Sequence, residues 1–296
     1  MEVKAIYPGS FGEILQGKVK GRDILLSCPV NIYTKVKLTE CDNPVNVKKI
    51  NLKKSSNFLL NILKCWGYER YYKNINMEIS SQIPRGKGLA SSTADLCAVY
   101  YSLIEMFHRK FSERELIRNC VKVEPTDSII FRKMTLFDYK HGKYKYILGD
   151  YLPYNILAFE GQRTIDTVEF NNKKLPDLSD VDDLVPILKE AVLEKNLGKL
   201  ACVSTESIVR NQKRLYYDFL DRIMDIKSRT SGLGVIGAHS GNALGIIYGD
   251  KEKIDFGEKF SKNLKLKNIK IYKVKALENF DFIKNACERG ADVYNG

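Results

Sequence analysis

Residues 83–93 read Ile83-Pro84-Arg85-Gly86-Lys87-Gly88-Leu89-Ala90-Ser91-Ser92-Thr93. Before this stretch, apolar residues alternate from Ile75 to Ile83, which predicts a strand. After it, apolar residues from Leu96 to Phe107 recur at helical spacing, which predicts a helix. The stretch is therefore a glycine-containing loop that joins a strand to the N-terminus of a helix.

Such a loop has the composition of an anion site. Gly86 and Gly88 would let the backbone approach a ligand closely. Ser91, Ser92 and Thr93 stand where free N–H groups and the positive end of the helix dipole converge, a place that holds phosphate. A hydroxyl there can also bind Mg²⁺, which prefers oxygen ligands. The loop alone is equally compatible with an ordinary capped strand–helix turn.

Two other glycine patterns do not carry the function that they suggest. Residues 12–18, Gly-Glu-Ile-Leu-Gln-Gly-Lys, resemble a Walker A loop, but Val19 replaces the required Ser or Thr, and a turn, not a helix, follows. Gly232, Gly234 and Gly237 match the spacing of a dinucleotide-binding loop. That match follows a predicted helix, not a strand, and we reject a Rossmann site.

The elements around the loop predict an α+β fold. Alternation from Asp23 to Thr39 indicates a half-buried strand, and an apolar stripe from Phe58 to Trp66 indicates a helix that Ser55 or Ser56 would cap. Ser112 and Glu115 form a capping box for a helix through about Val121. Further short strands are expected at 134–137, 143–147 and 155–159. No repeated βα period appears, which argues against a doubly wound sheet.

A polar, acidic stretch at 171–183 suggests a boundary between two domains, 1–175 and 176–296. In the second domain we expect helices at 181–196 and 198–229, a strand pair at 235–248, a helix at 252–264 and a strand at 269–274. The two domains would then both mix strands and helices.

Composition limits the class of protein. The 296 residues include 48 Lys and Arg and 36 Asp and Glu, for a net charge of +12. This charge suits an anionic substrate or a nucleic-acid surface, but the lysines are evenly spread, as on a solvated surface. The seven cysteines contain no C-x-x-C pair and the N-terminus lacks an apolar signal segment. We expect reduced thiols, a cytoplasmic location and no membrane contact.

The loop also carries a family resemblance. Pro84, Gly88, Leu89, Ser91 and Ser92 resemble the second motif of the GHMP kinases, which phosphorylate galactose, homoserine, mevalonate and related alcohols. Residues 8–13, Pro-Gly-Ser-Phe-Gly-Glu, resemble the family's first motif, and residues 231–249 its glycine-rich third motif. The resemblance implies an N-terminal domain like ribosomal protein S5 domain 2, which would carry the phosphate-binding loop, and a ferredoxin-like C-terminal domain.

Local matches are similar to the GHMP subfamily that phosphorylates L-threonine; they lie at residues 8–17, 27–30, 86–95, 124–128, 136–138 and 238–241. This resemblance implies ATP as co-substrate, Mg²⁺, and L-threonine O-3-phosphate as product, the precursor of the aminopropanol linker of cobalamin. The partners would be ATP and a hydroxy amino acid, with no nucleic acid. Another acceptor (homoserine, a sugar or a mevalonate-like alcohol) and a non-catalytic nucleotide- or RNA-binding protein remain alternatives.

The resemblance also implies roles for single residues. ATP phosphates would lie against the loop, at Pro84, Arg85, Gly86, Lys87, Gly88, Leu89, Ala90, Ser91, Ser92 and Thr93. Asp127 would take the hydroxyl proton or orient the alcohol, or else cap the next turn. Ser92 and Glu124 would hold the metal, although Glu124 could equally form a surface salt bridge. Lys87 and Arg85 could neutralise phosphate oxygens.

Two further residues are left with open roles. Glu13 would touch the substrate or orient the phosphate loop, and a structural hydrogen bond is an equal alternative. His239 is expected to be packed or to act behind another residue. The third motif departs from an unbroken run of glycines, because six residues separate Gly234 from Gly241, and we assign it no catalytic role.

Overall fold

The computed structural model describes residues 1–42, 52–163 and 175–280. Its strands are β1 (Glu2–Val19), β2 (Arg22–Glu40), β3 (Ile75–Ser81), β4 (Met134–Phe137), β5 (Lys145–Gly149), β6 (Asn155–Gly161), β7 (Gly234–Gly237), β8 (Ala243–Tyr248) and β9 (Ile269–Lys275). Its α-helices are α1 (Lys53–Trp66), α2 (Ser91–Met106), α3 (Glu113–Val123), α5 (Leu184–Leu193), α6 (Leu197–Asn211), α7 (Leu220–Arg229) and α8 (Lys251–Asn263). Two short 3₁₀ helices are η2 (Glu69–Asn74) and η3 (Ser128–Ile130).

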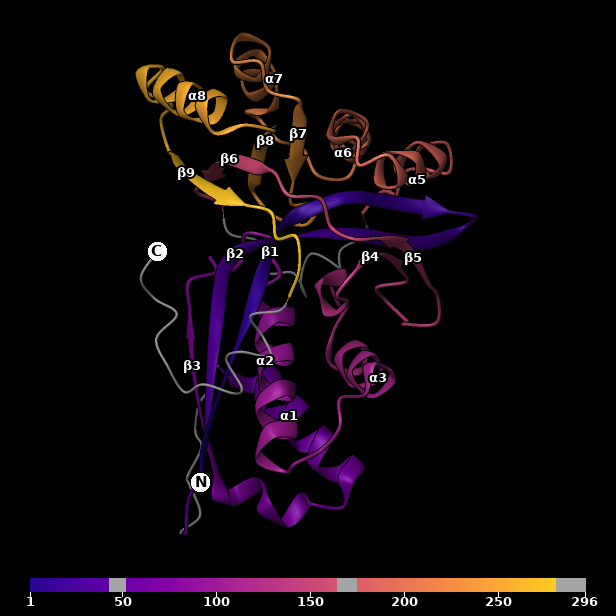
Figure 1. Ribbon diagram of the computed structural model, residues 1–296, viewed down its shortest axis with the longest axis vertical. Coiled ribbons are helices and arrows are strands. Elements are labelled where there is room, and N and C mark those ends of the chain that lie inside the picture. Colours follow the sequence, from indigo (N-terminus) through magenta and orange to yellow (C-terminus); the bar gives the residue numbers. More distant parts are fainter. Residues whose placement is uncertain (43–51, 164–174, 281–296) are drawn as a thin grey trace.

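The described strands form one nine-stranded sheet. Its order is β5-β4-β2-β1-β7-β8-β6-β9, with β3 also paired to β2, and each of these strand pairings is antiparallel. The two parts of the sheet meet where Glu13 of β1 pairs with Gly237 of β7. Figure 1 shows β1–β3 with α1–α3 on one side of this junction and β6–β9 with α5–α8 on the other. The α+β class is confirmed.

The long hairpin β1–β2 connects both parts. The alternation in 23–39 correctly predicts β2, whereas β1 was not predicted, because it is buried almost continuously from Tyr7 to Leu15 and therefore shows no period of two. The Walker-like residues 12–18 lie within β1, and Lys20 and Gly21 form the turn to β2. Rejection of a Walker A loop is thus confirmed.

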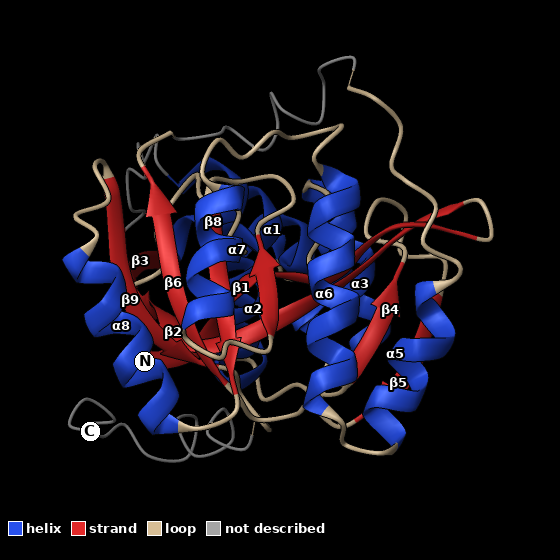
Figure 2. Cartoon of the chain, turned by 90° about the horizontal axis from the view of Figure 1, so that it is seen from above, coloured by secondary structure: helices blue, strands red, loops and turns tan. Residues whose placement is uncertain are grey.

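Two apolar clusters form the core, a larger one that runs through both parts of the sheet and a smaller one under α7 and α8. Helix α2 packs on β1 and β2 and is buried from Thr93 to Leu103. Helices α6, α7 and α8 cover one face of β6–β9 (Figure 2). Strand β6 separates two clusters, because Ile156 and Ala158 face the larger cluster while Leu157 and Phe159 face the one under α7 and α8. The boundary at 175/176 stays a prediction; β6 precedes it and pairs with β8 and β9.

Two predicted element ends are wrong. Helix α1 begins at Lys53 after Leu52, so Ser55 and Ser56 lie inside the helix and do not cap it. The stretch 198–229 is two helices, since α6 ends at Asn211 and α7 begins at Leu220. The Ser112 cap is confirmed, because its side chain accepts a hydrogen bond from the Glu115 N–H. No helix follows β7, which confirms the rejection of a Rossmann site.

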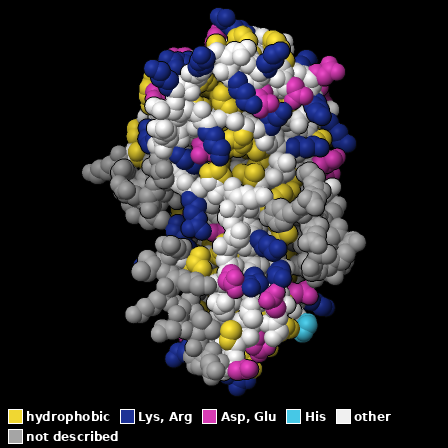
Figure 3. Space-filling model, turned by 90° about the vertical axis from the view of Figure 1, so that its left-hand side faces the viewer, with side chains coloured by type: hydrophobic (Ala, Val, Ile, Leu, Met, Phe, Trp, Pro, Cys, Tyr) yellow, Lys and Arg dark blue, Asp and Glu magenta, His cyan; other side chains and the backbone are white. Residues whose placement is uncertain are grey.

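The surface charge is mixed. On the face seen in Figure 3, Lys and Arg side chains are interspersed with Asp and Glu. Lys273 of β9, for example, pairs with Asp255 and Glu258 of α8.

Among residues 1–42, 52–163 and 175–280, no helix is both long and apolar enough to cross a membrane. The six cysteines in these ranges are free thiols, and Cys287 lies outside them.

Candidate active site

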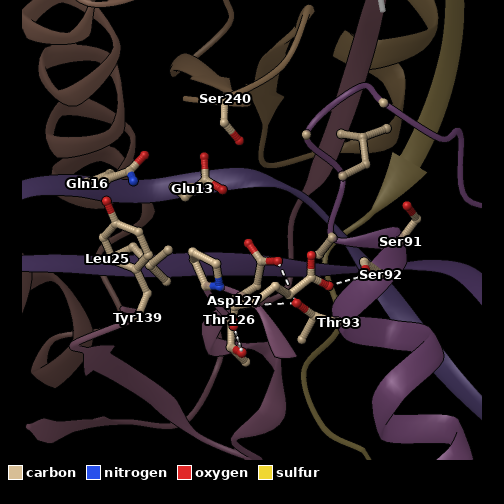
Figure 4. Close-up of a pocket in the computed structure, with 16 residues that line it drawn as sticks. Glu13, Gln16, Leu25, Ser91, Ser92, Thr93, Thr126, Asp127, Tyr139 and Ser240 are labelled. Atoms are coloured by element: carbon tan, nitrogen blue, oxygen red, sulfur yellow. Dashed lines mark hydrogen bonds between the residues drawn. The ribbon is translucent and has the colours of Figure 1, made fainter. Parts of the chain in front are cut away.

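A cavity lies at the junction of the two parts of the sheet. Figure 4 shows its sixteen lining residues: Glu13, Gln16, Leu25, Gly86, Gly88, Leu89, Ala90, Ser91, Ser92, Thr93, Glu124, Pro125, Thr126, Asp127, Tyr139 and Ser240. They come from the β1–β2 hairpin, the loop before α2 and its first turn, and the segment between α3 and η3. Tyr139, two residues after β4, and Ser240, in the loop between β7 and β8, complete the lining. Segments that are far apart in the sequence therefore share one site.

The N-terminus of α2 forms one wall. The residue before the helix, Ala90, has a left-handed backbone (φ 58°) and makes no side-chain capping bond. A methyl side chain cannot accept hydrogen bonds, so the amides of the first turn must find other acceptors. Together with the exposed edge of the glycine loop, this arrangement suits an anion.

Gly88 and Gly241 join the phosphate loop to the loop after β7. Gly88 has φ +73°, and a Cβ there would lie 2.7 Å from the Ala238 Cβ. A Cβ on Gly241 would lie 1.8 Å from the Lys87 carbonyl oxygen. Sequence reasoning explained Gly88 by approach to a ligand; the structure adds a different requirement, which is backbone-to-backbone packing of two loops.

Lys87 is directed away from the cavity. Its Nζ donates to the carbonyl oxygens of Gly161, Gln162 and Arg163, at 2.8, 2.9 and 3.1 Å, and the side chain is buried. These bonds fasten the loop to the end of β6. Of the residues predicted to bind phosphate, Gly86 and 88–93 line the cavity, whereas Pro84, Arg85 and Lys87 do not, and Arg85 is exposed.

The two residues predicted to hold the metal are in contact. The Ser92 hydroxyl donates a short hydrogen bond to Glu124 Oε1, and Lys54 Nζ lies 2.5 Å from Glu124 Oε2. Glu124 is buried, which leaves its charge dependent on these two partners. Lys54, on the first turn of α1, was missed because it lies 70 positions from Glu124.

The donor chemistry of Ser92 and Glu124 suits a magnesium ion. A carboxylate and a hydroxyl are hard oxygen donors, and Mg²⁺ normally takes only one or two carboxylates and completes its coordination with water and substrate phosphate oxygens. The described residues contain no group of three or more His, Cys, Asp and Glu that could form a protein-only metal site. A site with two protein donors beside an anion-binding helix end fits a magnesium ion that arrives with phosphate.

Asp127 stands beside the first turn of α2. Its Oδ2 accepts a hydrogen bond from the Thr93 hydroxyl at 2.8 Å, and its own N–H donates to Thr93 Oγ1 at 3.2 Å. Burial, and next the negative charge of Glu13, raise the pKa of Asp127 to about 7, while the Thr93 bond acts to lower it. A carboxyl that titrates near neutral pH is suited to general base chemistry. Asp127 also precedes η3, but it makes no side-chain capping bond there.

Glu13 is held by the third motif. Its Oε2 accepts from the His239 backbone N–H at 2.8 Å and lies 3.1 Å from His239 Nδ1. On the other side of the ring, His239 Nε2 lies 2.9 Å from Ser207 Oγ of α6. His239 is buried, as expected, and contacts Glu13. The segment 231–249 therefore shapes the site although it was assigned no role.

Six lining residues were not proposed from the sequence: Gln16, Leu25, Pro125, Thr126, Tyr139 and Ser240. Gln16, Pro125, Thr126 and Ser240 lie inside the subfamily matches at 8–17, 124–128 and 238–241, and Tyr139 directly follows the match at 136–138. Their positions in or beside matched segments were the available signal. Nothing in local periodicity marks Leu25 as a cavity residue, because its period is that of an ordinary strand.

Comparisons with known proteins agree with this geometry. A family model, the GHMP kinases N-terminal domain, matches residues 54–131. An L-threonine kinase of Salmonella typhimurium is 28% identical over 254 residues, covering 84% of this chain and 83% of that protein. An L-threonine kinase of Citrobacter freundii is 29% identical over 248 residues, with 81% and 84% covered.

The fold is also shared with a solved structure. A homoserine kinase of Cytophaga hutchinsonii superposes with a TM-score of 0.73 at 16% identity, over 94% of this chain and 95% of that one. The family model spans α1 to the residue after η3 and so contains every site residue predicted above except Glu13. In sequence and in fold the chain is thus similar to the GHMP kinases, and these similarities together support an ATP-dependent kinase of small molecules.

Proposed function

We propose that this kinase transfers the γ-phosphoryl group of ATP to the hydroxyl of L-threonine, to give L-threonine O-3-phosphate. One observation carries the proposal: Asp127, whose pKa is raised to about 7, lies in the same cavity as the uncapped N-terminus of α2. A proton acceptor and a phosphate cradle are thereby within reach of one bound alcohol. The choice of L-threonine is supported by the names of both curated relatives.

The phosphates of ATP would bind at Gly86, Gly88 and the first turn of α2, through backbone N–H groups. Phosphoryl transfer depends mainly on positioning and charge neutralisation, so a cradle of this kind supplies much of the catalysis. Glu13 lies between Gln16 and the first turn of α2 in Figure 4, where it would pair with the substrate ammonium group. Lys87 would act through its backbone, because its ammonium is bound by three carbonyl groups.

The chemical step follows from this placement. The threonine hydroxyl oxygen attacks the γ-phosphorus, the bond between that phosphorus and the β–γ bridging oxygen breaks, and ADP leaves with that oxygen. The hydroxyl proton passes to the Asp127 carboxylate as the new oxygen–phosphorus bond forms. Ser92 and Glu124 would hold Mg²⁺, which neutralises phosphate charge when bound. Thr93 keeps the Asp127 carboxylate directed toward the alcohol.

We further propose that the product serves the assembly of the aminopropanol linker of cobalamin.

The test of the acceptor is a screen that measures ADP release and identifies the phosphomonoester by ³¹P NMR. L-threonine should be the best acceptor, with L-serine slower, since a methyl-sized difference is worth only about 1–3 kcal/mol. D-threonine should be poor, because its three polar groups cannot all be satisfied in a site built for the L form.

Other outcomes separate the alternatives. A higher kcat/KM for homoserine, a sugar or a mevalonate-like alcohol would leave the kinase family intact and replace the acceptor. If none of these alcohols stimulates ATP consumption, and the chain instead binds RNA with a steep salt dependence, the proposed catalytic role is wrong.

A further inference from the structure

We propose that Gln16 and Tyr139 form a subsite that recognises the α-carboxylate of the acceptor, and that this subsite selects a free amino acid over a simple amino alcohol. The inference rests on the proposed function, since it concerns the acceptor side of the same cavity. It concerns residues that have no other assigned role. Gln16 belongs to β1, and Tyr139 follows β4.

A β-bulge is what brings Gln16 into the cavity. In a regular strand, residues 13 and 16 would point to opposite faces. Strand β1 pairs Glu13 with Ser27 but Leu15 with Leu26, so one extra residue is accommodated between them. The bulge reverses the alternation, and both Glu13 and Gln16 face the cavity. Leu25, the direct cross-strand partner of Gln16, faces it too.

Charge divides the cavity into two ends. Glu13, Glu124 and Asp127 all line its middle and the phosphate side, and no Lys or Arg is among the lining residues that the structure describes. In Figure 4, Gln16, Leu25 and Tyr139 lie together on one side of Glu13 and Asp127, and Ser91, Ser92 and Thr93 lie on the other. An amino acid carboxylate would be repelled by the three acids and would compete with ATP at the helix end. The neutral donors at the Gln16 end are the position left for it.

The Tyr139 hydroxyl can donate a hydrogen bond at the Gln16 end of the cavity. Burial raises the pKa of Tyr139 to about 12, so its hydroxyl is protonated at neutral pH. Gln16, which lies beside Tyr139 in Figure 4, acts against this rise. A protonated phenol can donate its O–H to an acceptor. The charges that act on Tyr139 are mixed, because those of Asp23 and Glu13 raise its pKa and that of Arg214 lowers it.

The order of groups along the cavity matches an amino acid. L-threonine carries its carboxylate and ammonium on Cα and its hydroxyl on Cβ. With the carboxylate at Gln16 and Tyr139 and the ammonium at Glu13, the hydroxyl extends toward Asp127 and the phosphate cradle. Three recognition points on one small molecule also fix its handedness.

The test compares L-threonine with (R)-1-amino-2-propanol, which is the same molecule without its carboxylate. Kinetics of Gln16→Leu, Tyr139→Phe and the wild type are measured with both, as substrates and as competitive inhibitors. We expect each variant to raise the KM for L-threonine about 10- to 100-fold, as for loss of a hydrogen bond to a charged group. Binding of the amino alcohol and the KM for ATP should stay unchanged.

A charge-reversed variant makes the test sharper. Gln16→Glu should weaken L-threonine more than Gln16→Leu does, and should strengthen the cationic amino alcohol. Tyr146→Phe, at an exposed tyrosine of β5, is the matched control and should change neither ligand. Melting temperatures of the variants show whether each remains folded.

The outcomes distinguish this inference from the proposed function. If the wild type phosphorylates L-threonine and the variants weaken both ligands equally, or neither, the carboxylate subsite is wrong while the function stands. If Gln16→Glu binds L-threonine as tightly as Gln16→Leu does, the subsite is also wrong. If the wild type does not phosphorylate L-threonine at all, it is the proposed function that fails.

Discussion

Asp127 is controlled by two neighbours that act in opposite directions. Glu13 adds negative charge and disfavours the ionised carboxyl, whereas the Thr93 hydroxyl donates to Oδ2 and favours it. Burial is the largest cause of the rise to about 7, and the charge of Glu124 adds to it. At the scale of a residue, the basicity of this carboxyl thus depends on its burial, on nearby negative charge and on one hydrogen bond.

Replacing Asp127 with Asn keeps its size and removes both charge and basicity. If Asp127 accepts the hydroxyl proton, kcat should fall about 10²- to 10⁴-fold while ATP affinity stays nearly intact. Steady-state kinetics and nucleotide titration measure the two quantities. Asp150→Asn, at an exposed position, is the control. Turnover near the wild-type value at several pH values would return Asp127 to a structural role.

The pH dependence should follow the same balance. A base must be deprotonated, so kcat/KM should decline as the pH falls through about 7. Glu13→Gln removes a charge that raises the pKa of Asp127, so the decline should move to lower pH. Thr93→Val removes a bond that lowers this pKa, so the decline should move to higher pH. A pH profile that moves in the same direction in both variants would contradict the assignment.

Two roles of Glu124, as a metal ligand and as the ion-pair partner of Lys54, can be distinguished by experiment. Glu124→Gln should raise the Mg²⁺ concentration needed for half-maximal activity about tenfold, because a charged oxygen ligand is lost. Lys54→Met removes the ion pair but leaves both oxygen donors. If the two variants show the same Mg²⁺ dependence as the wild type, Glu124 serves the salt bridge alone.

At the scale of elements, helix ends carry much of the organisation. Ser112 caps α3 through the Glu115 N–H at 3.3 Å, while the Glu115 carboxylate accepts bonds from Tyr100 and Trp66 and does not return to Ser112. Only half of the predicted capping box forms. Through these two bonds the Glu115 carboxylate ties α3 to α2 and α1. Helix α3 ends directly before Glu124, so this anchoring also positions a residue of the cavity.

Removing that cap gives a prediction for stability. Ser112→Ala should lower the free energy of unfolding by about 1 kcal/mol, as is typical for loss of an N-cap. Urea denaturation measures it, with Ser228→Ala as control, since that exposed hydroxyl bonds only the Met224 carbonyl of its own helix. An equal loss in the two variants would show that the Ser112 cap has no special weight.

At the scale of the whole molecule, the site exists because two loops from distant parts of the chain pack backbone to backbone. The contact between Gly241 and Lys87 brings the β7–β8 loop onto the phosphate loop. The neighbouring His239 then holds Glu13 on β1. The cavity therefore depends on how the two parts of the sheet meet.

Gly241→Ala tests this dependence. Its Cβ would lie 1.8 Å from a backbone oxygen, so the loops must separate, and we expect the KM for ATP to rise more than tenfold with a loss of melting temperature. Gly249→Ala is the matched control, because its nearest neighbours would be at 3.6 and 3.7 Å, an ordinary contact distance. Normal kinetics in Gly241→Ala would mean that this loop contact does not support the phosphate site.

The sequence alone determined the local features of the phosphate site. A strand, a glycine loop and the start of a helix are set by neighbouring residues, so β3, residues 86–93 and the first turn of α2 were predicted correctly. The motifs also indicated the family and named Ser92, Glu124 and Asp127, which lie together in the cavity. In these cases the information lies within a few residues or in a recognisable segment.

Tertiary structure alone decided the remainder. Lys54 lies 70 positions from Glu124, and the partners of Glu13 and Lys87 lie still further away, so nothing in local periodicity connects them. The bulge that turns Gln16 toward Glu13 is a property of pairing between β1 and β2, not of either strand by itself. Charge pairing, burial and register depend on which segments meet. The sequence therefore determined the glycine loop and the helix start that we propose to hold phosphate, whereas the assembled sheet decided where Glu13, Gln16 and Tyr139 lie.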